Sequence, residues 1–126
     1  MTTVIAVPAP AEFLSANDRL HALHKARVIK QWREAAAWAT KAHRLQSFGD
    51  QLVQITAFVH KPHARRYDAG NYYPTAKAAV DGLRDAGLLV DDDNDHVIGP
   101  DMRRGAADPR NPRLVLAIRT ITRSDA

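Results

Sequence analysis

The 126-residue chain contains no cysteine, which excludes disulfide scaffolds, thiolate zinc sites, iron–sulfur clusters and cysteine nucleophiles. It also lacks any apolar run near the roughly 20 residues that span a bilayer. The first residues lack the basic region and the long apolar core of a signal peptide. We therefore expect a cytoplasmic protein with no membrane segment. Hydrophobic residues make up 45% of the chain, a globular fraction that predicts one folded domain over residues 1–126.

Charge is distributed unevenly along the chain, whose formal net charge is +4. Residues 19–66 hold ten Lys and Arg against two acidic residues, whereas residues 67–126 hold eight Lys and Arg against ten Asp. A basic first half and an acidic second half suit a protein that binds a polyanion and also binds cations. The alternative explanation is a solvated helix face that happens to be basic.

Hydrophobic periodicity predicts a strand and a long helix in the first third of the chain. A β-rich run over residues 3–7 is followed by apolar residues at three-to-four spacing over about residues 18–46, the pattern of an amphipathic helix. Ser15 or Asn17 is expected to cap the start of this helix. Trp32 and Trp38 are both assigned to its apolar stripe, and we expect both in the core; a role as stacking platforms is the alternative.

The remaining pattern completes an α+β domain with a small mixed sheet, one long helix and one shorter helix. Residues 51–60 alternate and are rich in β-branched side chains, which predicts a strand. Pro74 then opens a second helix that ends before Gly87. The expected order is strand, long helix, strand, helix, short strand, strand. After the second helix we predict a short strand at residues 96–98, a loop at residues 101–112 and a last strand at residues 113–122.

An acidic run is the clearest candidate for chemistry. Asp91, Asp92, Asp93 and Asp95 fall within five residues, and carboxylates this close raise one another's pKa unless a cation neutralises them. Hard oxygen ligands of this kind suit Mg²⁺ or Mn²⁺. An EF-hand calcium loop is excluded, because His96 occupies the position that needs glycine. A flexible acidic loop after a helix is the alternative.

Two other residues could act with the acidic run. Asp68 follows a strand and precedes a helix, where loops often project catalytic side chains, although it could simply cap a turn. Lys77 falls one turn into the second helix, so its ammonium is expected to reach back toward Asp68. There it could steady a phosphate or a developing charge, and a solvated surface lysine is the alternative.

A series of short motifs along residues 65–92 is more specific than any one of them. It runs Arg65-Arg66-Tyr67-Asp68-Ala69-Gly70-Asn71, Lys77, Asp81-Gly82-Leu83, Ala86-Gly87 and Asp91-Asp92. The series resembles the RusA family of Holliday-junction resolvases, which shows basic residues, Asp-x-Asp-Asn, Lys-x-x-x-Asp-x-Leu-x-x-Ala-Gly and then a double Asp. The resemblance covers about residues 13–100.

The resemblance implies a small homodimeric α+β endonuclease that cuts four-way DNA junctions with Mg²⁺ or Mn²⁺. Carried over by position, Asp68, Lys77 and Asp92 would be catalytic. Asp68 and Asp92, with Asp91 beside them, would hold the metal where the second strand ends and the second helix begins. Contacts to DNA are expected at Arg19, Lys25, Lys61, Arg65, Arg66 and Asn71.

This sequence departs from the family pattern at two places. Gly70 stands where the second Asp of the motif belongs, so one expected metal ligand is missing. We expect the long acidic run to compensate, which leaves the enzyme active. Three extra residues between Asn71 and Lys77 lengthen the turn without moving Lys77 off its helix face. A non-cleaving protein that binds branched DNA, and a nuclease for flaps or other branched DNA, remain the alternative functions.

Overall fold

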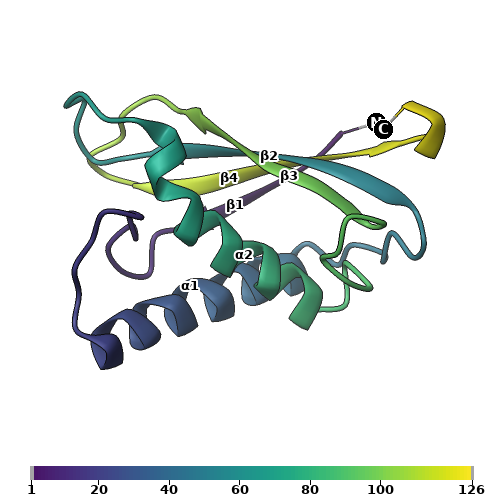
Figure 1. Ribbon diagram of the computed structural model, residues 1–126, viewed down its shortest axis with the longest axis horizontal. Helices are drawn as coiled ribbons and strands as arrows, with labels where there is room; N and C mark the ends of the chain where they lie inside the picture. The colour runs from purple at the N-terminus through teal and green to yellow at the C-terminus, as the bar shows by residue number, and fades with distance from the viewer. Residues whose placement is uncertain (1, 126) are drawn as a thin grey trace.

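A four-stranded sheet with two helices against one of its faces forms the fold (Figure 1). The structure is a computed structural model in which residues 2–125 are described. The order of strands and helices, β-α-β-α-β-β, and the mixed sheet confirm the predicted fold class. In chain order the elements are β1 (Thr2–Pro8), α1 (Ala22–Ala42), β2 (Leu52–His60), the 3₁₀ helix η1 (Ala69–Tyr72), α2 (Tyr73–Asp85), β3 (Val97–Arg104), β4 (Arg113–Ile121) and the 3₁₀ helix η2 (Arg123–Asp125).

The sheet has the strand order β1-β4-β2-β3. β4 is antiparallel to both β1 and β2, whereas β2 and β3 run parallel. Parallel neighbours need a crossover connection, which η1 and α2 provide. Consequently, residues 61–68 leave the carboxyl end of β2, and residues 86–96 enter β3 from its amino end.

The core lies between the helices and the inner face of the sheet. Alternate residues of the strands point into it, as predicted for residues 51–60 and 113–122, and the inner face of α2 is also as predicted. Trp32 of α1 is fully buried and its indole nitrogen is hydrogen-bonded, so its predicted place in the core is confirmed. Fully or almost fully buried positions include Ile5, Val7, Val53, Ile55, Ala57, Val59, Ala76, Val80, Leu83, Leu114, Leu116 and Ile118.

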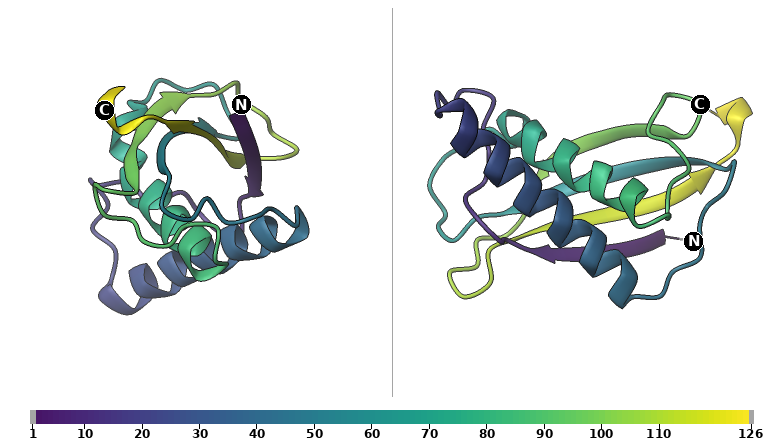
Figure 2. Two further views of the ribbon diagram at one scale, coloured as in Figure 1. Left: turned by 90° about the vertical axis from the view of Figure 1, so that its right-hand side faces the viewer. Right: turned by 90° about the horizontal axis from the view of Figure 1, so that it is seen from below.

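The opposite face of the sheet is not covered by either helix (Figures 1 and 2). We call it the open sheet face. Across β1, β4 and β2 it carries two rows of paired residues, Val4–Ala117–Thr56 and Ala6–Val115–Phe58. Val4 is 55% exposed. The fold thus leaves a mostly apolar strip of the sheet in contact with solvent.

The two helices pack against each other at a glycine. A Cβ built on Gly82 of α2 would lie 2.2 Å from the backbone oxygen of Arg33 and 2.9 Å from the Cβ of Ala36. Beside this contact, the Arg33 guanidinium forms a two-pronged ion pair with the carboxylate of Asp85.

Within residues 2–125, no helix combines the length and the apolar content needed to cross a membrane.

Helix α1 is shorter than predicted at both ends. It begins at Ala22, and the residue that caps it is His21, whose Nδ1 accepts the backbone N–H of Leu23 at 3.2 Å. The expected caps, Ser15 and Asn17, lie instead in a separate turn, in which the Asn17 N–H donates to Ser15 Oγ and Asp18 closes the turn on Ser15. At the other end the helix stops at Ala42. Residues 18–21 and 43–46 are therefore wrongly predicted as helix.

Two further predictions are wrong. Trp38 is 75% exposed, because six residues beyond Trp32 amount to about 240° of helix rotation, which turns it away from the core. Residues 101–104 are strand rather than loop, since β3 continues in parallel pairing with β2 as far as Arg104. The Gly99-Pro100 pair obscures this strand in the sequence, and the pairing with β2 shifts register between Gln54 and Thr56.

Candidate functional site

The start of α2 is fixed by a segment far away in the sequence. We call residues 12–16 the N-terminal strap. The Leu14 N–H donates to Thr75 Oγ1 at 2.7 Å, and the same hydroxyl donates to the Leu14 carbonyl at 2.9 Å. Ala16 N–H donates to the carbonyl of Asn71 at 2.7 Å. The strap therefore positions both η1 and the first turn of α2.

Aromatic rings and cations hold the loop between β2 and η1. The Tyr67 hydroxyl donates to the carbonyl of Val59 at 2.9 Å, and burial raises the pKa of Tyr67. Lys61 Nζ donates to the Tyr72 hydroxyl at 2.6 Å and lies 5.3 Å from the centre of the Tyr67 ring. The Arg104 guanidinium lies 4.9 Å from the centre of the same ring, within range of a cation–π contact. The loop that carries Asp68 is thus anchored at its base.

Asp68 is an exposed residue that caps η1. Its Oδ1 accepts the backbone N–H of Gly70 at 3.0 Å, the local geometry that aspartate favours in turns. This is the capping role left open as an alternative. A Cβ on Gly70 would lie 3.3 Å from the same Oδ1, so a carboxylate at position 70 would stand next to that of Asp68.

A second group of charged side chains gathers on α2 and the loop after it. We call Lys77, Asp81, Arg84, Asp91 and Asp92 the Lys77–Asp92 cluster. Lys77 Nζ donates to Asp92 Oδ2 and, at 3.2 Å, to Asp81 Oδ1. Arg84 donates to Asp92 Oδ1 at 3.3 Å and lies 3.9 Å from Asp91. Lys77 therefore turns toward Asp81 and Asp92 rather than back toward Asp68.

Helix geometry explains this grouping. Residues 77, 81 and 84 lie at i, i+4 and i+7 along α2, which places them on one face of the helix. The chain after α2 folds back along that face and brings Asp92 between Lys77 and Arg84. The side chain of Asp92 keeps only 18% of its surface exposed.

The contacts set the protonation states of the pair. The hydrogen bond from Lys77 holds the pKa of Asp92 well below its ordinary value, and Asp92 in turn raises the pKa of Lys77. At neutral pH Asp92 is therefore ionised and Lys77 is protonated. Lys77 can act as a positive charge toward a phosphate, but it cannot accept a proton.

The donors of the cluster fit a divalent cation by type. Carboxylate oxygens are the preferred ligands of Mg²⁺ and Mn²⁺. One ammonium already lies between Asp81 and Asp92, and one guanidinium lies near both Asp91 and Asp92. Among residues 2–125, no three Asp, Glu or His side chains converge in a geometry typical of a metal centre. Asp92, with Asp91 or Asp81, is the set that could hold the ion.

The rest of the acidic run is engaged separately. Asp93 Oδ1 lies 2.6 Å from Nδ1 of His96, and this contact raises the pKa of His96 and lowers that of Asp93. The Arg123 guanidinium donates to the backbone carbonyl of Asp95 at 2.6 Å. The run is thus divided between two groups, with Asp91 and Asp92 toward α2 and Asp93 toward His96.

The residues predicted to contact DNA differ in accessibility. Arg19, Lys25, Arg65 and Arg66 are exposed, whereas Lys61 and Asn71 are half-buried and take part in the contacts described above. Sequence reasoning gave no role to three charged residues of these groups. Arg104 lay in a predicted loop. Asp81, part of a quoted motif, and Arg84 could have been found from their positions four and seven residues after Lys77 on one helix face.

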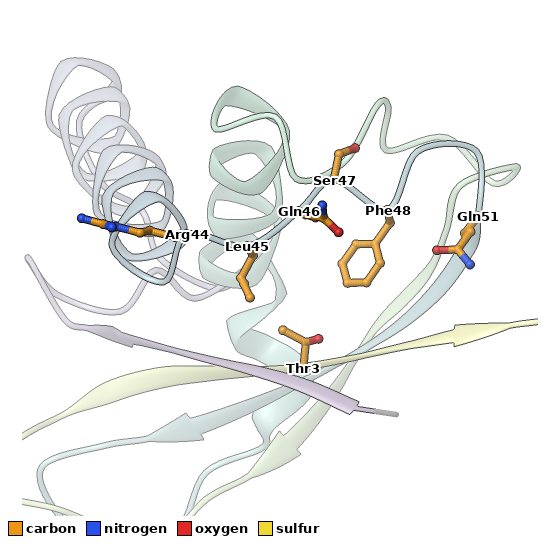
Figure 3. A pocket seen from close by; sticks show the side chains of 7 residues that line it. All are labelled: Thr3, Arg44, Leu45, Gln46, Ser47, Phe48 and Gln51. Carbon is orange, nitrogen blue, oxygen red and sulfur yellow. The ribbon is translucent and has the colours of Figure 1, made fainter.

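A shallow pocket lies apart from these groups, at the carboxyl end of α1. Its volume is about 330 Å³. Figure 3 shows the Phe48 ring and the Thr3 and Leu45 side chains around it. None of its lining residues belongs to the Lys77–Asp92 cluster or to the predicted DNA contacts; they are Thr3, Arg44, Leu45, Gln46, Ser47, Phe48 and Gln51.

Comparison with protein-family models and with curated proteins finds no match for this chain. Its function must therefore be inferred from its motifs, its surface charge and the side-chain contacts described above.

Proposed function

We propose that the protein is a divalent-metal-dependent endonuclease that cleaves phosphodiester bonds in four-way (Holliday) DNA junctions during recombination and repair. The observation that carries the proposal is the direct contact of Lys77 with Asp92, fifteen residues apart in the sequence. These are two of the three residues to which the resemblance to the RusA family assigns catalysis. Their pairing supports a shared role at one site.

The charges of the cluster suggest how it would act. Asp92 is ionised at neutral pH and, with Asp91 or Asp81 as a further ligand, would hold Mg²⁺ or Mn²⁺. Asp68, which caps η1 at the other end of the crossover, would need a separate ion. The bound ion supplies an activated water and stabilises charge at the phosphate under attack. Lys77 stays protonated, because its pKa is raised, and it offsets negative charge on a phosphate oxygen or on the leaving group.

The basic surface supports DNA as the partner. Arg19, Lys25, Arg65 and Arg66 are exposed and carry no counter-charge of their own among the described ion pairs. Phosphate contacts of this kind release counterions, so binding should weaken steeply as salt rises.

A homodimer is part of the proposal. A four-way junction presents two strands for cutting at near-symmetric places, and a two-fold dimer brings one Lys77–Asp92 cluster to each. The open sheet face is the surface we assign to the contact, because its two rows hold no charged side chain on β1, β4 and β2. The charged Asp101 and Arg103 of β3 lie beside them at the edge of the sheet. A specific interface typically buries about 800 Å² on each partner.

The deciding experiment is cleavage of a labelled synthetic four-way junction with Mg²⁺ and with EDTA. We expect metal-dependent nicking of the junction and little cutting of linear duplex. We also expect the protein to sediment as a dimer at micromolar concentration. Raising salt from about 50 to 200 mM should weaken junction binding by orders of magnitude. Preferred cutting of flaps would favour a nuclease for other branched DNA. Equal affinity for junction and duplex, with monomers only, would reject the proposal.

A non-cleaving protein that binds branched DNA is the second candidate. One observation favours it: Asp68 and Asp92 each bind groups of the chain itself, and Gly70 offers no second carboxylate beside Asp68. Binding of junctions without nicking in any divalent metal would establish this second function.

Gly70→Asp tests the missing ligand. The new carboxylate would stand beside that of Asp68, since a Cβ at position 70 lies 3.3 Å from Asp68 Oδ1. Two adjacent carboxylates bind a divalent cation more strongly than one. We expect tighter Mn²⁺ binding and a changed metal dependence of cleavage, measured by Mn²⁺ titration of both proteins. Gly70→Asn is the matched control without charge. Superimposable titration curves for wild type and Gly70→Asp would place position 70 outside the metal site.

A further inference from the structure

The outward side of α1 contains a tryptophan that the fold does not use. Trp38 is 75% exposed, whereas Trp32, six residues earlier, is fully buried and donates its indole N–H to the carbonyl of Glu12. Within residues 2–125, no hydrogen bond to the Trp38 indole is formed. A large aromatic ring left in water forgoes the free energy that its burial would supply, and Trp38 is therefore available to contact another molecule.

Cations lie on the same side of the helix as this ring, with Lys41 one turn beyond it. We call Arg27, Lys30, Glu34, Trp38 and Lys41 the outer face of α1, because their spacing places them on the side opposite the core. The single acid, Glu34, lies 3.8 Å from Lys30. Three cations and one carboxylate leave this face with a net positive charge over about 21 Å of helix.

The charge argues against a second copy of the chain as the occupant. A two-fold interface brings the same patch of each subunit together, so the outer face of α1 would place like charges opposite one another. A nucleic-acid strand matches both features, because its phosphates meet the Lys and Arg side chains and its bases present flat π-faces to the indole. The base faces of duplex DNA are stacked within the helix and are not open to Trp38.

We propose that the outer face of α1 binds an unpaired DNA strand, with the Trp38 indole stacked on a base. This inference rests on DNA as the substrate and adds to it a preference for DNA with unstacked nucleotides, such as the open centre of a junction or a single-stranded arm. It does not depend on metal or on cutting.

Tryptophan fluorescence tests the proposal directly, because only one of the two tryptophans is accessible. The probes are a 15-nucleotide oligo(dT) strand and a 15-base-pair duplex, each added to the full chain in EDTA. We expect oligo(dT) to quench the Trp38 emission saturably and to shield it from acrylamide, with a much smaller effect of the duplex. Trp38→Ala should weaken oligo(dT) binding by roughly 5- to 100-fold, as for loss of one stacked base, while Trp38→Phe keeps most of the affinity.

Leu23→Ala is the matched control, since Leu23 is 71% exposed on the same helix and offers no π-face. It should bind oligo(dT) within about twofold of wild type. Equal affinity of wild type and Trp38→Ala, without quenching, would overturn the proposal. So would shielding of Trp38 from acrylamide that grows with protein concentration in the absence of DNA, which would identify the face as an interface between copies. Because cleavage is not measured, failure of the nuclease function leaves this result intact.

Discussion

Asp92→Asn is expected to abolish junction cleavage while junction binding stays unchanged or becomes tighter. The substitution removes a carboxylate from the proposed metal site and reduces the negative charge near the DNA, but it removes no phosphate contact. The fold should survive, because Lys77 keeps Asp81 as a partner and Arg84 keeps Asp91. Cleavage rate and junction affinity, measured on the same preparation, test both halves of the prediction.

Asp95→Asn is the matched control for this experiment. Asp95 lies in the same acidic run, yet its side chain is exposed and forms no ion pair with the described residues. It should cut junctions at close to the wild-type rate.

Lys77→Ala should impair cleavage, since it removes the positive charge that offsets the negative charge of the phosphate. Nicking by Asp92→Asn at the wild-type rate would instead assign the metal to Asp91 or Asp93.

Gly82→Ala is expected to destabilise the protein strongly, although alanine favours helices by about 1 kcal/mol over glycine. The added Cβ would lie 2.2 Å from the backbone oxygen of Arg33 and 3.0 Å from the backbone nitrogen of Ala37. Backbone atoms of a packed helix cannot turn aside as a side chain can, so α1 and α2 must move apart. We expect a loss of about 2 kcal/mol or more, and a fall in Tm of roughly 10 °C, measured by thermal and denaturant unfolding.

Gly70→Ala provides the comparison. A Cβ at position 70 meets only the flexible side chain of Asp68, at 3.3 Å, and should change the unfolding free energy by less than about 0.5 kcal/mol. Similar losses of unfolding free energy for Gly82→Ala and Gly70→Ala would mean that the close approach of the helices at Gly82 is not the cause of the destabilisation.

The sequence was most informative where one residue pattern determines one structure. Alternation over residues 51–60 and 113–122 identified the two central strands and the side of each that is buried. The fold class followed from the order of the elements. Periodicity was less reliable for single residues, since Trp38 was assigned to the core although its rotation from Trp32 places it in solvent.

The candidate site was only partly predictable, because its geometry depends on how strands pair. Lys77 and Asp92 are both assigned to the site by the resemblance to the RusA family, and they are in contact. The expected approach of Lys77 to Asp68 does not occur. Since β2 and β3 are parallel, the segment before α2 and the segment after it lie at opposite ends of the two strands. The pairing direction, and hence this separation, cannot be derived from motif spacing.

The N-terminal strap makes the two helices mechanically dependent at one end. Glu12 accepts the indole N–H of Trp32 in α1 at 2.8 Å, and Leu14 exchanges two hydrogen bonds with Thr75 in α2. A displacement of α1 would therefore displace the N-terminal strap, which also positions the first turn of α2. If the protein binds DNA as proposed, a force that DNA exerted on α1 would be transmitted to α2, which carries Lys77, and DNA binding would be coupled to cleavage.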